Sequence, residues 1–173
     1  MAFSGRHERA WVRGAQAGNA PDIEALFRAH WQPALRAAFL VVHDAAAAED
    51  IAQEAFLAAV RRLHLFDRGR PFGPWLHRIV VNRAIDWTRS RQLRAETGLV
   101  DAGVWDDEPD VSDDTLAALA RLTPEHRAVI VLRHLLGYSP GEIADLLELP
   151  RGTVNSRLRR GLDTLKETVL RET

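Results

Sequence analysis

The chain has 173 residues, of which 46% are hydrophobic and 27% are charged, a composition that favours a globular protein over a disordered chain. It contains no cysteine, which excludes disulfides, thiolate metal ligands and a cysteine nucleophile. No apolar run approaches the roughly 18 residues of a membrane span, and the first residues lack the apolar core of a signal peptide. These features predict a soluble cytoplasmic protein without membrane insertion.

The net charge of −1 conceals an uneven distribution of charge along the chain. Residues 1–94 carry a net charge of +5 and residues 115–173 carry +2, whereas residues 95–114 carry −8 and contain no basic side chain. Charge segregation of this kind indicates contact with nucleic acid better than the total charge does. The charge distribution therefore indicates two basic segments as candidates for contact with nucleic acid, with an acidic segment between them.

Residues 23–63 predict helix, because apolar side chains recur at the i, i+3, i+4 spacing of an amphipathic helix. Pro33 interrupts this pattern and is expected to mark a kink or a break. Asp44 is placed to cap the alanine-rich helix that follows. Two helices are therefore expected in this part of the chain.

The next segment combines a loop, a helix and a change of composition. Residues 67–74 contain two glycines and two prolines and predict a loop, after which a helix is expected to begin at Trp75. The apolar periodicity stops over residues 95–114. We interpret that stretch as an acidic flexible linker between two domains, residues 1–94 and residues 115–173.

Helix signals return after the linker and are strongest where two short helices follow each other. Thr123, with a proline at the next position, is a helix start, and Ser139 with Glu142 forms a capping box. A break at Pro150 leads into a last helix, expected over residues 152–169. No strand-like alternation occurs, so the predicted fold is all-α, with two small helical domains.

The segment over residues 139–160 has the pattern of a helix-turn-helix. The outer face of its second helix carries basic and amide side chains, which in the major groove of B-DNA can bind guanine and adenine. A helical hairpin with a solvated basic face is the alternative interpretation. The candidate duplex-binding residues are Arg151, Thr153, Asn155, Ser156, Arg157, Arg159 and Arg160.

A second basic segment, residues 61–94, carries a net charge of +7 and interleaves aromatic side chains with arginines. Unpaired bases stack on aromatic rings while arginine neutralises phosphate, so this composition suits single-stranded nucleic acid. Packing of the aromatic residues in the core and solvation of Asn82 are the alternatives. The candidate residues are Arg68, Arg70, Phe72, Trp75, Arg78 and Asn82.

A group of polar side chains lies on the alanine-rich helix. Asp50 and Glu54 are four residues apart, so they share one helix face with Gln53 beside them. Three hypotheses remain open: a solvated face, a docking face for a basic partner, and a pair of divalent-metal ligands. The chain has no phosphate-binding loop, nucleophile elbow or dinucleotide fingerprint, so no catalytic residue and no cofactor is predicted.

Taken together, these segments resemble the bacterial sigma-70 family of RNA polymerase sigma factors, specifically its small extracytoplasmic-function (ECF) group. The likeness covers about residues 20–94 and 113–170, with several motifs in the expected order. The motifs are AEDIAQEAF at residues 48–56, FGPWLHRIVVN at 72–82, LTPEHR at 122–127 and GTVNSRL at 152–158.

The resemblance implies that the chain directs core RNA polymerase to promoters. Asp50, Gln53, Glu54 and Phe56 would then bind the clamp helices of the polymerase β′ subunit. The loop and helix over residues 67–82 would melt and read the promoter −10 element, and the last helix would read the −35 element. The acidic linker would thread toward the active-site cleft, and residues 133–137 would contact the β flap. An anti-sigma factor is a further implied partner.

Two departures from the family pattern bear on promoter choice. Asn155 stands where many relatives carry lysine or arginine, and Arg70 followed by Pro71 makes the −10 loop stiffer and more basic. Two other functions compete with the leading one. The first is an autonomous helix-turn-helix transcriptional regulator, and the second is a small nuclease that uses Glu49, Asp50 and Glu54.

Overall fold

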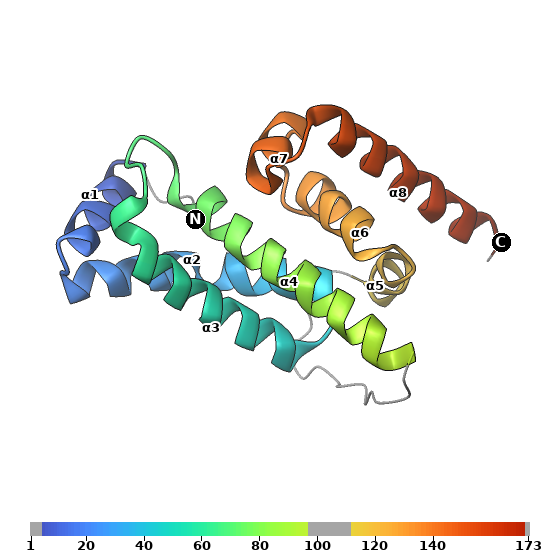
Figure 1. Ribbon diagram of the computed structural model, residues 1–173, viewed down its shortest axis with the longest axis horizontal. Coiled ribbons are helices and arrows are strands. Elements are labelled where there is room, and N and C mark those ends of the chain that lie inside the picture. The colour runs from blue at the N-terminus through green and yellow to red at the C-terminus, as the bar shows by residue number, and fades with distance from the viewer. Residues whose placement is uncertain (1–4, 97–111, 172–173) are drawn as a thin grey trace.

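The computed structural model describes residues 5–96 and 112–171, and within these ranges it contains helices and no strand (Figure 1). The first range forms α1 (Gly5–Gln16), α2 (Ala20–Val42), α3 (Ala45–Arg62), the short 3-10 turn η1 (Leu63–Leu65) and α4 (Phe72–Glu96). The second range forms α5 (Asp113–Ala120), α6 (Pro124–Ile130), the π-helical turn η2 (Val131–Leu135), α7 (Pro140–Leu147) and α8 (Arg151–Arg171). The predicted all-α fold is confirmed. Across the described ranges, no helix has the length and apolar character needed to cross a bilayer.

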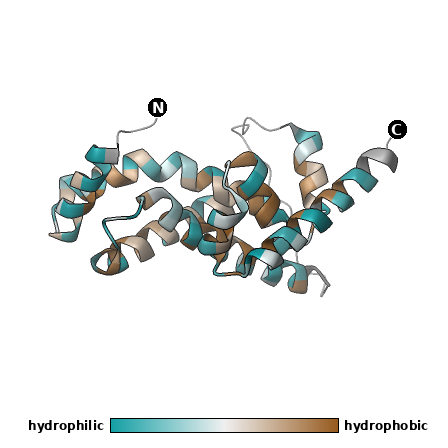
Figure 2. Ribbon diagram, turned by 90° about the horizontal axis from the view of Figure 1, so that it is seen from above, coloured by the Kyte–Doolittle hydropathy of each residue, from teal (hydrophilic) through white to brown (hydrophobic). Residues whose placement is uncertain are grey.

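Helices α2, α3 and α4 pack against one another, and α1 covers one end of α2 (Figure 1). The buried apolar residues of these helices belong to one core cluster, and Figure 2 shows hydrophobic residues interspersed with hydrophilic ones along the helices. Alanines make up most of the buried face of α3 and part of the buried face of α2, which lets the two helices approach closely. The fully buried alanines are Ala34, Ala37, Ala38, Ala48, Ala52, Ala55 and Ala59.

Three predicted helix caps are present in the structure. The Asp44 carboxylate accepts a hydrogen bond of 2.9 Å from the backbone of Ala47 at the start of α3. The Thr123 hydroxyl caps α6 in the same way. At α7 the capping box is complete, because the Ser139 hydroxyl accepts from the Glu142 amide at 3.2 Å and the Glu142 carboxylate accepts from the Ser139 amide at 2.8 Å.

Two expectations about the first half need correction, and the structure adds one helix. Helix α2 continues through Pro33, so the break, one of the two alternatives expected there, is wrong. The loop predicted over residues 67–74 ends earlier, because α4 begins at Phe72. Proline is tolerated in the first turn of a helix, since an amide hydrogen there would have no partner within the helix. Helix α1 was not expected at all. Residues 97–111 of the predicted linker lie outside the described residues, and the ends of that linker belong to α4 and α5.

Helices α6 and α7 lie against α4, so the two halves of the chain contact each other (Figure 1). The buried guanidinium of Arg127 connects them: it donates 2.8 Å and 2.7 Å hydrogen bonds to the carbonyls of Leu119 and Val41, the second at the end of α2. It also donates to the carbonyls of Ala120 and Leu122. Burial lowers the pKa of Arg127 to about 10, so the side chain stays protonated at neutral pH. One cation thus binds carbonyls at the C-terminal ends of two helices, where the negative end of each helix dipole lies.

Candidate functional site

The polar side chains predicted for the polymerase-binding face are exposed on α3. Asp50, Gln53 and Glu54 occupy adjacent turns, and the Glu54 carboxylate pairs with Arg83 of α4 at 2.7 Å. A cavity of about 300 Å³ between α3 and α4 is lined by Asp50, Glu54, Arg83 and Trp87, among others. The face therefore combines carboxylates with a neighbouring cation and an apolar wall.

Phe56 does not belong to this exposed surface, which corrects the prediction that it contacts a partner. Its side chain is 5% exposed and lies between α2 and α3, with its ring centroid 5.0 Å from that of Phe27 and 6.3 Å from that of Trp31. Its contribution is to hold α3 against α2. By contrast, Leu57 and Val60 of α3 are 57% and 40% exposed, and sequence reasoning missed them. Helical spacing could have indicated Leu57, because it follows Gln53 by four residues and thus continues the same helix face.

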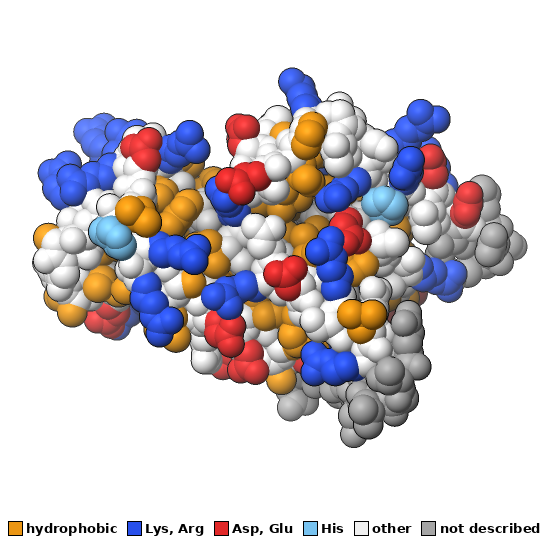
Figure 3. All heavy atoms as spheres, in the orientation of Figure 1, with side chains coloured by type: hydrophobic (Ala, Val, Ile, Leu, Met, Phe, Trp, Pro, Cys, Tyr) orange, Lys and Arg blue, Asp and Glu red, His pale blue; other side chains and the backbone are white. Residues whose placement is uncertain are grey.

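Helix α1 holds the basic loop between η1 and α4. The Gln16 amide donates hydrogen bonds of 2.8 Å and 3.0 Å to the carbonyls of Leu63 and Phe66, and its oxygen accepts from the guanidinium of Arg68. Within the loop, the Asp67 carboxylate accepts from the amide of Gly69 at 2.8 Å. Arg68 and Arg70 are exposed, so both predicted cations are available to a ligand. Figure 3 shows basic side chains gathered over this end of the molecule, where α1 and the loop lie.

Phe72 is buried, so the prediction that it contacts DNA is wrong for this structure. Its side chain is 2% exposed and packs against the rings of His30, Phe66 and Trp75. Its amide donates a 3.2 Å hydrogen bond to the Glu8 carboxylate, which places a negative charge at the start of α4. Glu8 also contacts His30 at 2.9 Å, and burial lowers the pKa of His30 although Glu8 acts in the opposite direction. Trp75 is half-buried at the edge of this cluster.

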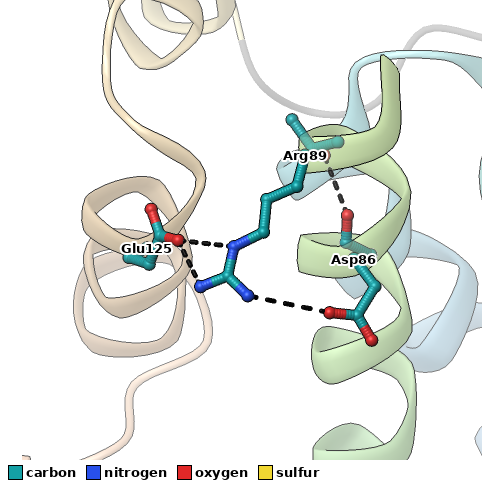
Figure 4. Close-up of polar contacts among 5 residues, drawn as sticks. Asp86, Arg89 and Glu125 are labelled. Atoms are coloured by element: carbon teal, nitrogen blue, oxygen red, sulfur yellow. Dashed lines mark hydrogen bonds and ion pairs between the residues drawn. The ribbon is translucent and has the colours of Figure 1, made fainter. Parts of the chain in front are cut away.

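The remaining residues predicted to bind single-stranded DNA lie where α4 meets the second half. The Arg78 guanidinium contacts the Glu148 carboxylate at 2.5 Å, and the Arg89 guanidinium donates to the Glu125 carboxylate at 2.6 Å (Figure 4). Burial acts to raise the pKa of Glu125, but hydrogen bonds from its own backbone and from Arg89 lower it overall. Asn82 lines a cavity of about 230 Å³ together with Arg89 and Glu125. Arg78 and Asn82 thus face the second half of the chain.

Two half-buried histidines also lie at this junction. His77 of α4 shares a 2.6 Å hydrogen bond between its Nδ1 and the Tyr138 hydroxyl, and it bonds the backbone of Pro33. Burial lowers the pKa of His77 to about 4 and raises that of Tyr138 to about 12. Burial and the nearby charge of Arg127 lower the pKa of His43 to about 4. Both histidines are therefore neutral at pH 7.

Helices α7 and α8 form the predicted helix-turn-helix, with the three residues 148–150 between them. Val154 is fully buried and Leu158 is 9% exposed, so the inner face of α8 packs against the domain. Gly161 allows close approach to α6, since a Cβ there would lie 2.9 Å from Ile130. The outer face carries Arg151, Asn155, Ser156, Arg159 and Arg160, all exposed, whereas Thr153 and Arg157 are half-buried.

Metal binding finds no support in the part of the chain that the structure describes. No group of three or more histidine, aspartate or glutamate side chains is close enough there to hold a metal ion. The Asp50 and Glu54 carboxylates lie beside Arg83, a cation that would compete with a divalent ion.

Comparison with known families gives two matches that together cover most of the chain. Residues 26–94 match the family described as Sigma-70 region 2, and residues 112–165 match the family described as Sigma-70, region 4. The boundary between the two matches coincides with the acidic segment.

Curated proteins and solved structures agree with these matches. The chain is 37% identical over 169 residues to the ECF RNA polymerase sigma factor SigL of Mycobacterium tuberculosis, covering 92% of this chain and 96% of that protein. It is 34% identical over 144 residues to SigW, an ECF RNA polymerase sigma factor of Bacillus subtilis, covering 73% and 75%. Among solved structures, CnrH in complex with the cytosolic domain of CnrY superimposes with a TM-score of 0.74 at 27% identity, covering 96% of this chain and 99% of that one.

Proposed function

The chain belongs to the sigma-70 family as an ECF sigma factor, an alternative subunit that binds core RNA polymerase and directs transcription from promoters, and we propose how its surfaces divide that task. Residues 1–94 bind polymerase and the −10 element, residues 95–114 form the linker, and residues 115–173 bind the −35 element. The polymerase supplies the chemistry of RNA synthesis, and this chain supplies recognition, in the cytoplasm. An autonomous regulator is not favoured, because both halves match sigma regions in order.

The exposed face of α3 docks the clamp helices of the polymerase β′ subunit. Asp50, Gln53 and Glu54 provide polar contacts, and the neighbouring exposed Leu57 and Val60 provide apolar area. Protein interfaces combine a central apolar patch with a polar rim, and this face has both parts. In the second half, residues 133–137 and the surrounding helices contact the β flap.

The basic loop and α4 bind the melted −10 strand. Arg68 and Arg70 neutralise phosphates, Trp75 offers a half-buried ring at the edge of the loop, and Arg78 and Asn82 meet the bases. Phe72 supports this surface from beneath by packing against the aromatic cluster.

Helix α8 enters the major groove at the −35 element. The main support for this assignment is a row of exposed basic and amide side chains on α8. The row lies opposite the buried Val154 and Leu158, and α7 of the same helix-turn-helix begins with a complete capping box. Such a face positions arginines for guanine or phosphate and Asn155 for adenine. An anti-sigma partner is part of the proposal, because the similar protein CnrH was solved in complex with the cytosolic domain of CnrY.

The test is run-off transcription by core polymerase supplied with the purified chain, alongside duplex binding. Replacing Arg160 by alanine is expected to weaken binding to the −35 duplex and to reduce the slope of log affinity against log salt by roughly 0.9 if the contact is to phosphate. Replacing Lys166 by alanine removes the same charge from an exposed position further along α8 and serves as the matched control. A chain that fails to bind core polymerase, or an Arg160 variant that behaves like the Lys166 variant, would contradict the assignment.

A further inference from the structure

Helix α1 carries a row of arginines on its outer face. Arg6, Arg9 and Arg13 are three and four residues apart, so they lie on one side of the helix, and all three are exposed. The inner face of α1 packs against the first half through Val12 and Ala15, which are 2% and 6% exposed. Helix α1 also precedes residue 26, where the match to Sigma-70 region 2 begins. The row is therefore a basic surface outside the matched region.

The arginine row of α1 lacks carboxylate partners among the residues that the structure describes. Glu8, the one acidic residue in the sequence of α1, instead contacts His30 at 2.9 Å and accepts a 3.2 Å hydrogen bond from the amide of Phe72. By contrast, four arginines of α4 each contact a carboxylate. The charges on α1 thus remain available to a ligand.

The row works against the stability of its own helix. Like charges three and four residues apart on a helix repel each other, and here Arg9 has an arginine at both spacings. Arg6 lies in the first turn, where a cation opposes the helix dipole. The fold gains nothing from this arrangement, so its benefit must come from a ligand that carries closely spaced negative charges.

The row leads directly to the basic loop between η1 and α4. Gln16 follows Arg13 by three residues, and its side chain accepts from Arg68 of the loop and donates to the carbonyl of Leu63 at 2.8 Å. At the other end of α1, Glu8 binds the first amide of α4. Helix α1 is thus fixed to both sides of the loop, and Figure 3 shows basic side chains over this end of the molecule.

The spacing and the composition of the row favour the phosphates of a nucleic acid over a protein partner. From Arg6 to Arg13 the helix rises about 10 Å, which corresponds to about three phosphates at about 3.4 Å each along one DNA strand. A protein interface has an apolar centre, but none of the large apolar side chains that are exposed among the described residues lies on α1.

We propose that α1 binds the phosphates of the promoter strand beside the −10 element, so that the strand continues from the basic loop across the outer face of α1. The inference rests on the proposed binding of the −10 strand by the loop. Contacts to phosphate fix the path of a strand but carry no sequence information. Helix α1 therefore adds affinity at any promoter without changing the preferred −10 bases.

The test measures binding of the holoenzyme to a fork template with a duplex −35 element and a single-stranded −10 element. The template is one that the wild-type holoenzyme selects from a random library. The α1 variant, Arg6→Gln, Arg9→Gln, Arg13→Gln, keeps helix-forming side chains. We expect its affinity to fall about ten-fold at low salt. The slope of log affinity against log salt should decrease by about 0.7 for each lost contact to the single strand.

Two further variants separate phosphate binding from folding and from net charge. Replacing the same three arginines by lysine keeps the charges and should retain the wild-type salt slope, which a purely structural role of the arginines does not predict. The control Arg28→Gln, Arg121→Gln, Lys166→Gln removes an equal charge at exposed positions elsewhere and should bind like wild type. The α1 variant should also bind core polymerase as tightly as wild type. A loss of that affinity would identify α1 as a polymerase contact and overturn the proposal.

Uncharged methylphosphonate linkages locate the contact on the DNA. Three successive linkages on one flank of the −10 element should weaken binding by wild type and leave binding by the α1 variant unchanged. Equal effects on both proteins at both flanks would contradict the proposal. The role of the loop has a separate readout, since it fails if Arg70→Gln binds the template like wild type. The inference about α1 fails if Arg70→Gln weakens binding and the α1 variant does not.

Discussion

Protonation of His43 and His77 is expected to destabilise the folded chain below neutral pH. Both side chains lie at the junction of the two halves, and both have a pKa of about 4 compared with the ordinary value of 6.5. The unfolded chain therefore binds more protons than the folded chain between these values. It follows that the free energy of unfolding falls as the pH falls through this window.

The size of the effect follows from the two pKa values. A difference of about 2.5 units corresponds to about 3.4 kcal/mol for each histidine once the folded form is also protonated. At about pH 5 the unfolded histidine is almost fully charged and the folded one is mostly neutral, which gives a loss of about 2 kcal/mol for each side chain. Losses of this size are a large part of the stability of a small domain, which totals about 5–15 kcal/mol.

The assay is urea unfolding followed by far-UV circular dichroism at about pH 7.5 and about pH 5. His77→Gln keeps a hydrogen-bonding side chain opposite Tyr138, and His43→Asn suits the left-handed backbone at φ 54°. Each variant should lose about 2 kcal/mol less than wild type between the two pH values. His64→Gln, at an exposed position, should follow wild type. If the free energy of unfolding of all three variants depended on pH as it does in wild type, the reasoning would be refuted.

Three further outcomes are expected. Reversing Asp50 and Glu54 to lysine should abolish capture of core polymerase. The circular dichroism spectrum should stay unchanged, since substitutions at exposed positions usually cost within about 0.5 kcal/mol of stability. Capture of polymerase by the folded variant would contradict the assignment of α3. Arg127→Met should lower the free energy of unfolding by about 3–5 kcal/mol, because four carbonyls lose their donor; an unchanged thermal midpoint would show that this network is dispensable. Phe72→Ala should cost about 3–5 kcal/mol of stability. Asn82→Ala should leave stability unchanged but should fail in run-off transcription on both duplex and pre-melted templates. The two variants thus distinguish a residue that packs in the core from a residue that binds the single strand.

Local chemistry explains why the second half could be predicted closely. A cap joins residues that are three apart in sequence, so the signals at Thr123 and at Ser139 with Glu142 are complete before any tertiary contact forms. The outer face of α8 follows from helical periodicity once Val154 and Leu158 are assigned to the interior. The predicted duplex-binding residues therefore lie where the pattern indicated, although Thr153 and Arg157 are half-buried.

The first half could be predicted less well, because its determining contacts join residues far apart in the chain. Glu8 bonds the amide of Phe72, and Gln16 bonds both η1 and the basic loop, so α1 supports a surface that lies at least 47 residues away in sequence. Helix α2 passes through Pro33 because its packing against α3 and α4 compensates for the hydrogen bond that proline removes. Phe72 was assigned to DNA because its neighbours are basic, yet an aromatic cluster buries it.

The interior of the first half and the polar contacts at the junction of the halves differ in how they resist change. Fully buried alanines and larger aliphatic residues hold α2, α3 and α4 together, and closely packed apolar contacts of this kind resist rearrangement. The polar contacts across the junction include the Arg78–Glu148 and Arg89–Glu125 pairs, which are partly exposed and therefore individually weak. Breaking these ion pairs therefore costs less than opening the buried faces that α2, α3 and α4 share.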